Sequence, residues 1–275
     1  MYTLNCKGQL LVIDKPIVMG IVNVTPDSFY SGSRQQASEN ILQTVQKMLD
    51  DGASIIDIGG QSTRPGSSFI SADEEADRVI PAIEQVIKSI PGAIISIDTF
   101  HSKVAKWAVN AGAKMVNDIS AGSMDSDMIS TVAELHVPYI IMHMKGTPQT
   151  MQQSPHYNNV SVEVLDFLIA KKEACRAAGI HDIIIDPGFG FGKTITHNFT
   201  LLKQLEVLKI MNVPILAGLS RKGMVYKTLG TTAEEALNGT TALNTIALLN
   251  GANILRVHDV KEAMECIKLV QAYQQ

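Results

Sequence analysis

Cysteine is scarce in this sequence, with three residues in 275, and no two of them lie close together. Cys6, Cys175 and Cys266 offer neither the short spacing of a zinc site nor an even set for a disulfide framework. Scattered thiols are typical of a reducing compartment, so we expect free cysteines and a cytoplasmic location. Cys175 and Cys266 fall within helical stretches, where we expect packed thiols.

Long hydrophobic runs and clusters of basic residues are also missing. The apolar segments are short, and Asp14 and Lys15 come early, so we expect neither a signal peptide nor a membrane span. The formal net charge is −4 and the basic residues are scattered, which argues against a nucleic-acid partner. The expected partners are small molecules.

What the sequence does have is a regular series of short apolar segments. Of its residues 45% are hydrophobic, enough to bury a large core without metal or disulfide. Most of the segments are rich in Ile or Val and bounded by Gly, Pro or Asp, the pattern of buried parallel strands. They span residues 17–22, 54–58, 93–97, 114–116, 138–142, 182–185, 214–217 and 252–257.

Helical periodicity fills the intervals between these segments. Ser71 and Thr232 each begin a capping-box sequence, which marks a helix start. Candidate helix-ending glycines are Gly52, Gly112, Gly179 and Gly251. The clearest periodic stretches are 41–49, 79–90, 160–178, 200–208 and 233–249.

Strand and helix alternate eight times, which predicts one α/β domain over residues 1–275, a (β/α)8 TIM barrel. A doubly wound open sheet is the structural alternative. Residues 3–14 precede the first barrel strand and are expected to form a short hairpin at the barrel bottom.

Polar side chains follow every predicted strand. In a TIM barrel these positions share the C-terminal rim, where such enzymes carry their active sites. A single polar residue there can simply cap the next helix, but convergence of all eight strands indicates a binding site. The positions are Asn23, 59–64, Asp98, Asn117, His143, Asp186, 220–222, and Arg256 with His258.

This rim has a donor half and an acceptor half. The donors suit phosphate oxygens, and the acceptors suit a flat heterocycle that presents N–H and NH₂ groups side by side. The donors are Arg64, Lys222, Arg256 and His258. The acceptors are Asp98, Asn117 and Asp186. The residues alone therefore indicate an anionic ligand with a nitrogen-rich ring.

Covalent catalysis and structural zinc are not expected. The rim carries no cysteine, Ser220 has no obvious histidine–aspartate relay, and no two-histidine metal motif occurs. Residues 186–194 resemble a phosphate-binding P-loop, but Pro187 stands where its first glycine belongs and Lys193 replaces the third glycine of the dinucleotide pattern. We expect the loop to approach a planar ligand, with Phe189 or Phe191 beside it.

The ordered rim motifs resemble those of the dihydropteroate synthase family, over nearly the whole chain. That family joins 6-hydroxymethyl-7,8-dihydropterin diphosphate to p-aminobenzoate and releases diphosphate, as a transferase of folate biosynthesis. The matching segments are 23–29, 59–66, 98–99, 117–120, 142–148, 186–193, 220–222 and 256–259.

The resemblance implies roles for individual residues. The pterin would be held by Asp98, Asn117, Asp186 and Lys222, at a pocket edge formed by Met142. The diphosphate would be contacted by Thr63, Arg256 and His258, with Asn23 helping to hold Mg²⁺. The p-aminobenzoate and sulfonamide site would include Phe29, Arg64, Pro65, Phe191 and Ser220. Catalysis would depend on Lys222, Arg256, His258 and Arg64.

The family also implies a homodimer that packs through its late helices, and competition between sulfonamides and p-aminobenzoate. The first loop departs from the family pattern at Ser31, where an aspartate is usual, and the second at Gln61, where glutamate is common. Two other interpretations stay open: a related methyltetrahydrofolate-binding methyltransferase barrel, and an inactive barrel that only binds pterins.

Overall fold

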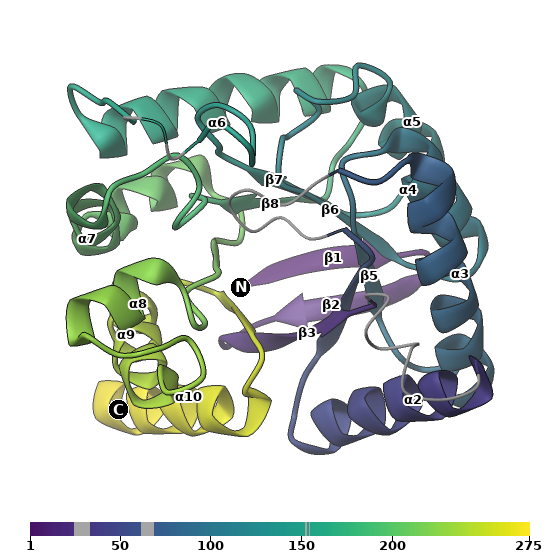
Figure 1. The fold of residues 1–275 in the computed structure, drawn as a ribbon. Coiled ribbons are helices and arrows are strands. Elements are labelled where there is room, and N and C mark those ends of the chain that lie inside the picture. The colour runs from purple at the N-terminus through teal and green to yellow at the C-terminus, as the bar shows by residue number, and fades with distance from the viewer. Residues whose placement is uncertain (25–33, 62–68, 152, 154) are drawn as a thin grey trace.

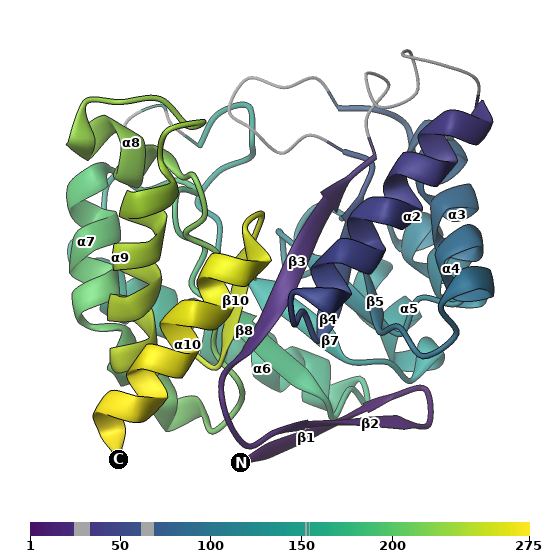
Figure 2. The ribbon, with the colours of Figure 1, turned by 90° about the horizontal axis from the view of Figure 1, so that it is seen from below.

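The computed structural model describes residues 1–24, 34–61, 69–151, 153 and 155–275. It shows a parallel barrel ringed by helices, with a hairpin across one end (Figures 1 and 2). The strands are β1 Tyr2–Cys6, β2 Gln9–Ile13, β3 Ile17–Asn23, β4 Ile55–Gly59, β5 Ile95–Asp98, β6 Met115–Asp118, β7 Tyr139–Met142, β8 Ile183–Asp186, β9 Leu216–Ala217 and β10 Ile254–Val257. The helices are α2 Arg34–Asp50, α3 Ala72–Ser89, α4 Ser102–Asn110, α5 Met128–Leu135, α6 Val160–Ala177, α7 Ile195–Lys203, η1 Leu205–Met211, α8 Gly223–Leu229, α9 Leu237–Leu249 and α10 Val260–Gln274.

The eight barrel strands are parallel and lie in the order β8-β7-β6-β5-β4-β3-β10-β9. A parallel bridge between Ile185 and Ile215 joins the two ends of this series, and the Ile185 amide donates to the Pro214 carbonyl at 3.0 Å. The sheet is thus closed into a barrel, as predicted, and the open doubly wound alternative is wrong.

Side chains alternate between the two faces of each strand, as the pleat requires. In β4, Ile56 and Ile58 belong to the large cluster formed with the surrounding helices, whereas Ile55 belongs to a second cluster inside the barrel. The inward positions change from aliphatic to polar along the strand, because Asp57 follows Ile55 on the same face. The barrel interior is therefore apolar at the bottom and polar towards the C-terminal rim.

The N-terminal hairpin closes the bottom of the barrel (Figure 2). Leu4, Cys6 and Leu11 are buried in the interior cluster, which confirms the predicted hairpin and explains its apolar alternation. The turn end of the hairpin is fixed to the barrel, since the Asn5 amide donates to Asp182 Oδ2 at 2.9 Å and Gln9 Nε2 to the Gly92 carbonyl at 3.2 Å.

Most of the helix signals in the sequence coincide with helix ends in the structure. Ser71 caps α3 by accepting from the Glu74 amide at 3.1 Å. The predicted cap at Thr232 is wrong: α9 begins at Leu237 after Ala236, and Glu235 bonds to Thr231 instead. The stretch predicted as one helix over 200–208 is divided between the end of α7 and the 3-10 helix η1.

Two further predictions concern composition. All three cysteines are free and buried, as expected for packed thiols. Among the described residues, no helix is long and apolar enough to cross a membrane.

The interior cluster should contribute more to stability than the outer helical surface. We expect Ile254→Ala to lower the free energy of unfolding by about 2–5 kcal/mol, because it opens a cavity inside the barrel. Ile169→Ala, on the partly exposed surface of α6, should cost no more than about 0.5 kcal/mol. Urea unfolding of both variants checks this, and equal losses would contradict it.

Candidate functional site

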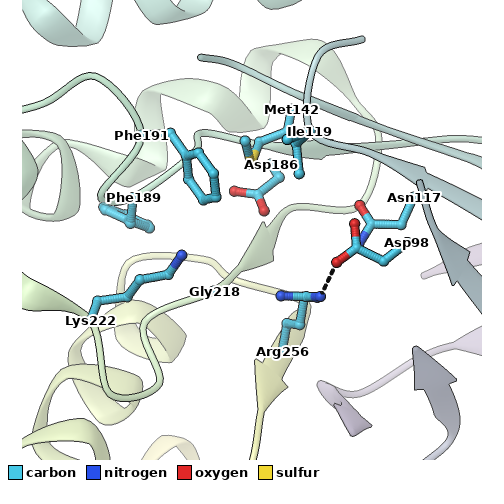
Figure 3. Close-up of a pocket in the computed structure, with 10 residues that line it drawn as sticks. All are labelled: Asp98, Asn117, Ile119, Met142, Asp186, Phe189, Phe191, Gly218, Lys222 and Arg256. Atoms are coloured by element: carbon cyan, nitrogen blue, oxygen red, sulfur yellow. Dashed lines mark hydrogen bonds and ion pairs between the residues drawn. The ribbon is translucent and has the colours of Figure 1, made fainter. Parts of the chain in front are cut away.

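A pocket opens among the C-terminal ends of the barrel strands (Figure 3). Its walls come from five strand ends and from the loops that follow β6, β8 and β9. The lining residues are Asp98, Asn117, Ile119, Met142, Asp186, Phe189, Phe191, Gly218, Lys222 and Arg256. Seven of the residues predicted from the sequence therefore share one cavity.

Arg256 lies at the base of this pocket between two acids. Its Nε donates to Asp57 Oδ2 and its Nη2 to Asp98 Oδ2, both at 2.7 Å. Burial alone would lower the pKa of Arg256, but these carboxylates raise it above the usual value. The guanidinium is therefore a permanent cation held in one orientation.

The acceptor residues are strongly desolvated. Burial raises the pKa of Asp98 to about 7, with Asp57 and Asp118 adding to the shift and Arg256 and Lys222 opposing it. Burial also raises the pKa of Asp186, although the Gly188 amide donates to its Oδ1 at 2.7 Å. Both carboxyls are poised to gain from a ligand that donates hydrogen bonds to them.

Lys222 extends towards the same cavity from the start of α8 (Figure 3). Its Nζ lies 4.3 Å from the centroid of the Phe191 ring, a cation–π contact. Burial, together with the neighbouring Arg256, lowers the pKa of Lys222 to about 8, while Asp186 and Asp98 act in the opposite direction. The lysine thus places a titratable positive charge in the same pocket as Asp98 and Asp186.

Ser220 and His258 lie beside each other at the ends of their strands. The Ser220 Oγ is 3.0 Å from His258 Nδ1 and accepts from the His258 amide at 3.3 Å. Burial and the neighbouring Arg256 lower the pKa of His258 to about 4, so the ring is neutral near pH 7. Asp259 pairs with Arg221 at 2.8 Å, and the described contacts therefore give no serine–histidine–aspartate relay.

Asp57 is the site residue that the sequence reading missed. It is fully buried in β4, and its Oδ2 also accepts from Asn117 Nδ2 at 2.9 Å. A charged residue inside the otherwise aliphatic run 55–58 was the available signal, since buried charges in strands are costly unless paired.

The glycine loop after β8 is fastened by its own lysine. Lys193 Nζ lies 2.9 Å from His143 Nδ1 and donates to the carbonyls of Gly188 and Phe191 at 2.9 and 3.1 Å. Burial lowers the pKa of Lys193 to about 7, which Asp186 opposes. Because this ammonium group is turned into the protein, the loop does not act as a P-loop, and it supports Phe189 and Phe191 at the pocket wall.

The remaining predicted residues lie elsewhere. Asn23 ends β3 with an exposed side chain and does not line the pocket. Phe29, Ser31, Thr63, Arg64 and Pro65 lie outside the described residues, so their predicted roles stay predictions.

Comparison with known proteins identifies the kind of enzyme to which this site belongs. Residues 19–258 match the family described as "Pterin binding enzyme". The chain therefore belongs to the pterin-binding enzymes.

Individual relatives narrow this further. The dihydropteroate synthase of Escherichia coli K12 is 41% identical over 268 residues, which cover 97% of this chain and 94% of the relative. The dihydropteroate synthase of Xanthomonas albilineans, solved with 4-aminobenzoic acid, has a TM-score of 0.92 at 41% identity, covering 99% of this chain and 98% of that one. Within the pterin-binding enzymes, the chain is a member of the dihydropteroate synthase family.

Two further complexes show what such proteins bind. The Xanthomonas albilineans enzyme was also solved with 7,8-dihydropteroate, with a TM-score of 0.89, 39% identity and 99% coverage of both chains. The Yersinia pestis dihydropteroate synthase, solved as a sulfonamide drug complex, has a TM-score of 0.92 at 40% identity, again covering 99% of both chains.

The glycine loop offers a test of the pocket wall. At Gly188, which has φ +71°, an added Cβ would overlap the His143 carbonyl oxygen, whereas at Gly179, with φ +94°, it would meet nothing within 4 Å. Both alanine variants should pay about 1–3 kcal/mol of backbone strain, and only Gly188→Ala should also displace the loop and weaken pterin binding. Thermal unfolding and calorimetric titration measure the two effects. Wild-type pterin affinity in Gly188→Ala would contradict this account.

Proposed function

We propose that this chain joins 6-hydroxymethyl-7,8-dihydropterin diphosphate to p-aminobenzoate, releasing diphosphate, and so acts as a dihydropteroate synthase in folate biosynthesis. The observation that carries the proposal is one pocket in which the desolvated acceptors Asp98 and Asp186 and the cations Arg256 and Lys222 lie together. A substrate that is both a hydrogen-bond-donating ring and an anion needs this pairing. A methyl-transferring barrel would have no need for the anion-binding half.

The ring of the pterin would lie on the acceptor side. Asp98 and Asp186 can each accept N–H donors from the heterocycle, and Asn117 presents a further polar group beside them. Met142 and Phe189 supply apolar wall on the same cavity. The ring would therefore be bound by a few directed hydrogen bonds between apolar walls.

The reaction breaks the bond between the pterin CH₂ and the diphosphate oxygen, and forms a bond from that carbon to the nitrogen of p-aminobenzoate. The electron-rich ring stabilises positive charge on the carbon, so the leaving group is the part that needs the protein. Arg256 and Lys222 carry the charges suited to it, and the neutral His258 ring can donate a hydrogen bond. The amine is already nucleophilic, so its proton leaves to solvent or diphosphate without a strong base.

Magnesium is the metal that this chemistry would use. The described residues hold no cluster of three or more histidine, cysteine or acidic groups, so an all-protein metal cage is not the expected arrangement. Asn23 fits a different arrangement, because Mg²⁺ often takes one or two protein oxygens and completes its shell with phosphates and water. When bound, the ion would neutralise charge on the diphosphate, with Asn23 as a protein ligand.

The second substrate would bind nearer the rim. Phe191 and Ser220 are the described members of the predicted p-aminobenzoate and sulfonamide subsite, and Phe191 already contacts Lys222. Thr63 and Arg64, with Phe29 and Pro65, would complete the diphosphate and p-aminobenzoate contacts from the first two loops. We place the whole reaction in one domain, residues 1–275, of a cytoplasmic protein.

The proposed activity is tested by one assay. Purified protein with Mg²⁺ should release diphosphate only when pterin diphosphate and p-aminobenzoate are both present. Asp98→Asn should abolish pterin binding in calorimetric titration, because the carboxylate that accepts ring N–H groups is lost. Release without p-aminobenzoate, or unchanged pterin affinity in Asp98→Asn, would contradict the proposal.

The two shifted pKa values predict a narrow pH optimum. Asp98 becomes a carboxylate as the pH rises through its pKa of about 7, and Lys222 loses its charge as the pH rises through about 8. The value of kcat/KM for the pterin should therefore rise through the first and fall through the second. In Lys222→Arg the alkaline limb should move to higher pH while the acidic limb stays. A flat wild-type profile between about pH 6 and pH 9 would contradict both assignments.

The protein is further proposed to be a homodimer that pairs through its late helices. Leu269 and Tyr273, one turn apart on α10, are 71% and 80% exposed, and Ile246 and Leu249 of the neighbouring α9 are partly exposed. Exposed apolar side chains gathered on adjacent helices are typical of subunit contacts.

The proposed dimer can be tested by placing a charged side chain on the exposed apolar surface of α10. Light scattering should give twice the chain mass for the wild type and the single chain mass for Leu269→Arg, because a buried unpaired charge disrupts an apolar interface. Val12→Arg, on the outer face of the hairpin, is the matched control and should stay dimeric. A dimeric Leu269→Arg would place the interface elsewhere.

A further inference from the structure

Asp57 is a buried acid that the pocket does not expose. Its side chain has no exposed surface, and it is not among the residues that line the cavity. Two residues that do line the cavity nevertheless donate to its Oδ2 atom, Arg256 through Nε at 2.7 Å and Asn117 through Nδ2 at 2.9 Å. One carboxylate oxygen thus connects two parts of the site.

The strand order explains how Asp57 can contact both Arg256 and Asn117. β4, which carries Asp57, lies two strands from β10 on one side and two strands from β6 on the other. Inward-facing side chains of a barrel meet across its interior, so Asp57 lies below and between Arg256 and Asn117. It is one inward position earlier on β4 than Gly59, which pairs with Asp98 of β5.

The contact with Asn117 fixes the polarity of an amide. A carboxamide has a donor end and an acceptor end of nearly the same shape, and an ionised carboxylate can only accept. Asp57 therefore retains the Asn117 nitrogen, and the Asn117 oxygen is turned towards the pocket (Figure 3). A ring that presents N–H groups meets an acceptor at this position.

The contact with Arg256 fixes a guanidinium. Nε bonds to Asp57 and Nη2 to Asp98, which are charge-assisted hydrogen bonds from two neighbouring donors on one edge of the planar group to two different carboxylates. The two anchors hold the plane in one orientation at the base of the cavity (Figure 3). The donors that these acids do not use remain for an anionic ligand.

The charge balance distinguishes Asp57 from a simple partner for Arg256. Asp98 already pairs with the guanidinium, so a second buried carboxylate is not needed to neutralise it. Asp57 also adds to the raised pKa of Asp98, against the effects of Arg256 and Lys222. A buried acid that duplicates one ion pair and orients an amide is better explained by the site than by stability.

We propose that Asp57 is a positioning residue for the pterin, which holds the Asn117 oxygen towards the ring and the Arg256 guanidinium in its binding orientation. This inference rests on the proposed function, because it assigns Asn117 and Arg256 to the pterin diphosphate. It adds a residue that touches neither substrate.

The test is Asp57→Asn, which keeps the shape and removes the charge. An amide at this position can donate as well as accept, so the orientation of Asn117 is no longer enforced. We expect the KM for pterin diphosphate to rise about tenfold or more, and the KM for p-aminobenzoate to stay within about twofold. Unchanged pterin KM would overturn the inference.

A pH profile separates positioning from mere stability. Removing the Asp57 charge should lower the pKa of Asp98, so the acidic limb of kcat/KM should move to lower pH than in the wild type. The other charged groups that interact with Asp98, which are Arg256, Lys222, Asp118 and Glu75, are unchanged in this variant. A lower melting temperature with no movement of that limb would assign Asp57 a structural role only.

Asp118→Asn is the matched control. Asp118 is equally buried, but its carboxylate serves Tyr139, Ser120 and Gly122, which do not line the pocket. This variant should lose stability and keep its pterin KM near the wild-type value. A pterin KM raised as much as in Asp57→Asn would mean that loss of any buried acid disturbs the site, and would overturn the inference.

A measurement on the wild type covers the case in which Asp57→Asn does not fold. The Nδ2 protons of Asn117 in the ligand-free protein should be slow to exchange with solvent in a nitrogen-15 spectrum, because one of them is bound by a buried carboxylate. Fast exchange would overturn the inference. If the wild type itself does not release diphosphate with both substrates, the proposed function fails instead, and the two failures are distinguishable.

Discussion

Successive side chains of each barrel strand point alternately to the helices and into the barrel. This alternation separates the residues that pack against the helices from those that form the site. Outward positions such as Ile56, Ile58 and Ile97 are fully buried against the helices, where any polar atom would need a partner. Inward positions fill the barrel, aliphatic at the bottom and charged near the rim. A stable outer layer therefore supports an inner layer in which desolvated acids and cations can be held close together. The raised pKa of Asp98 and the lowered pKa of Lys222 are the result.

Much of this arrangement follows from the sequence because it is local. The Ile- and Val-rich segments predicted all eight barrel strands to within a few residues, and the residue that ends a strand necessarily reaches the rim. Asp98, Asn117 and Asp186 were found in this way. Helix boundaries were less predictable where turns compete with caps: Thr232 has the right sequence for a cap, but α9 starts five residues later.

The rest depends on contacts between distant segments, which no local pattern records. Asp57 and Arg256 are 199 residues apart, and only closure of the barrel brings them together. In the sequence, Lys193 comes directly after a glycine-rich loop, the position of the lysine in a phosphate-binding loop. In the structure, its ammonium group is turned inward to His143 and the carbonyls of its own loop. Ser220 and His258, on neighbouring strand ends, form a hydrogen bond that could not be deduced from either motif.

The hairpin at the other end of the barrel limits the route by which ligands can enter and leave the pocket. Leu4, Cys6 and Leu11 plug the bottom, and bonds from Asn5 and Gln9 fasten the plug to the barrel. Among the described residues, the bottom of the barrel is thus closed, and the pocket lies at the opposite, C-terminal end. A ligand held beside Asp98 and Asp186 would therefore have to exchange with solvent through the C-terminal rim, because the plugged bottom offers no second route.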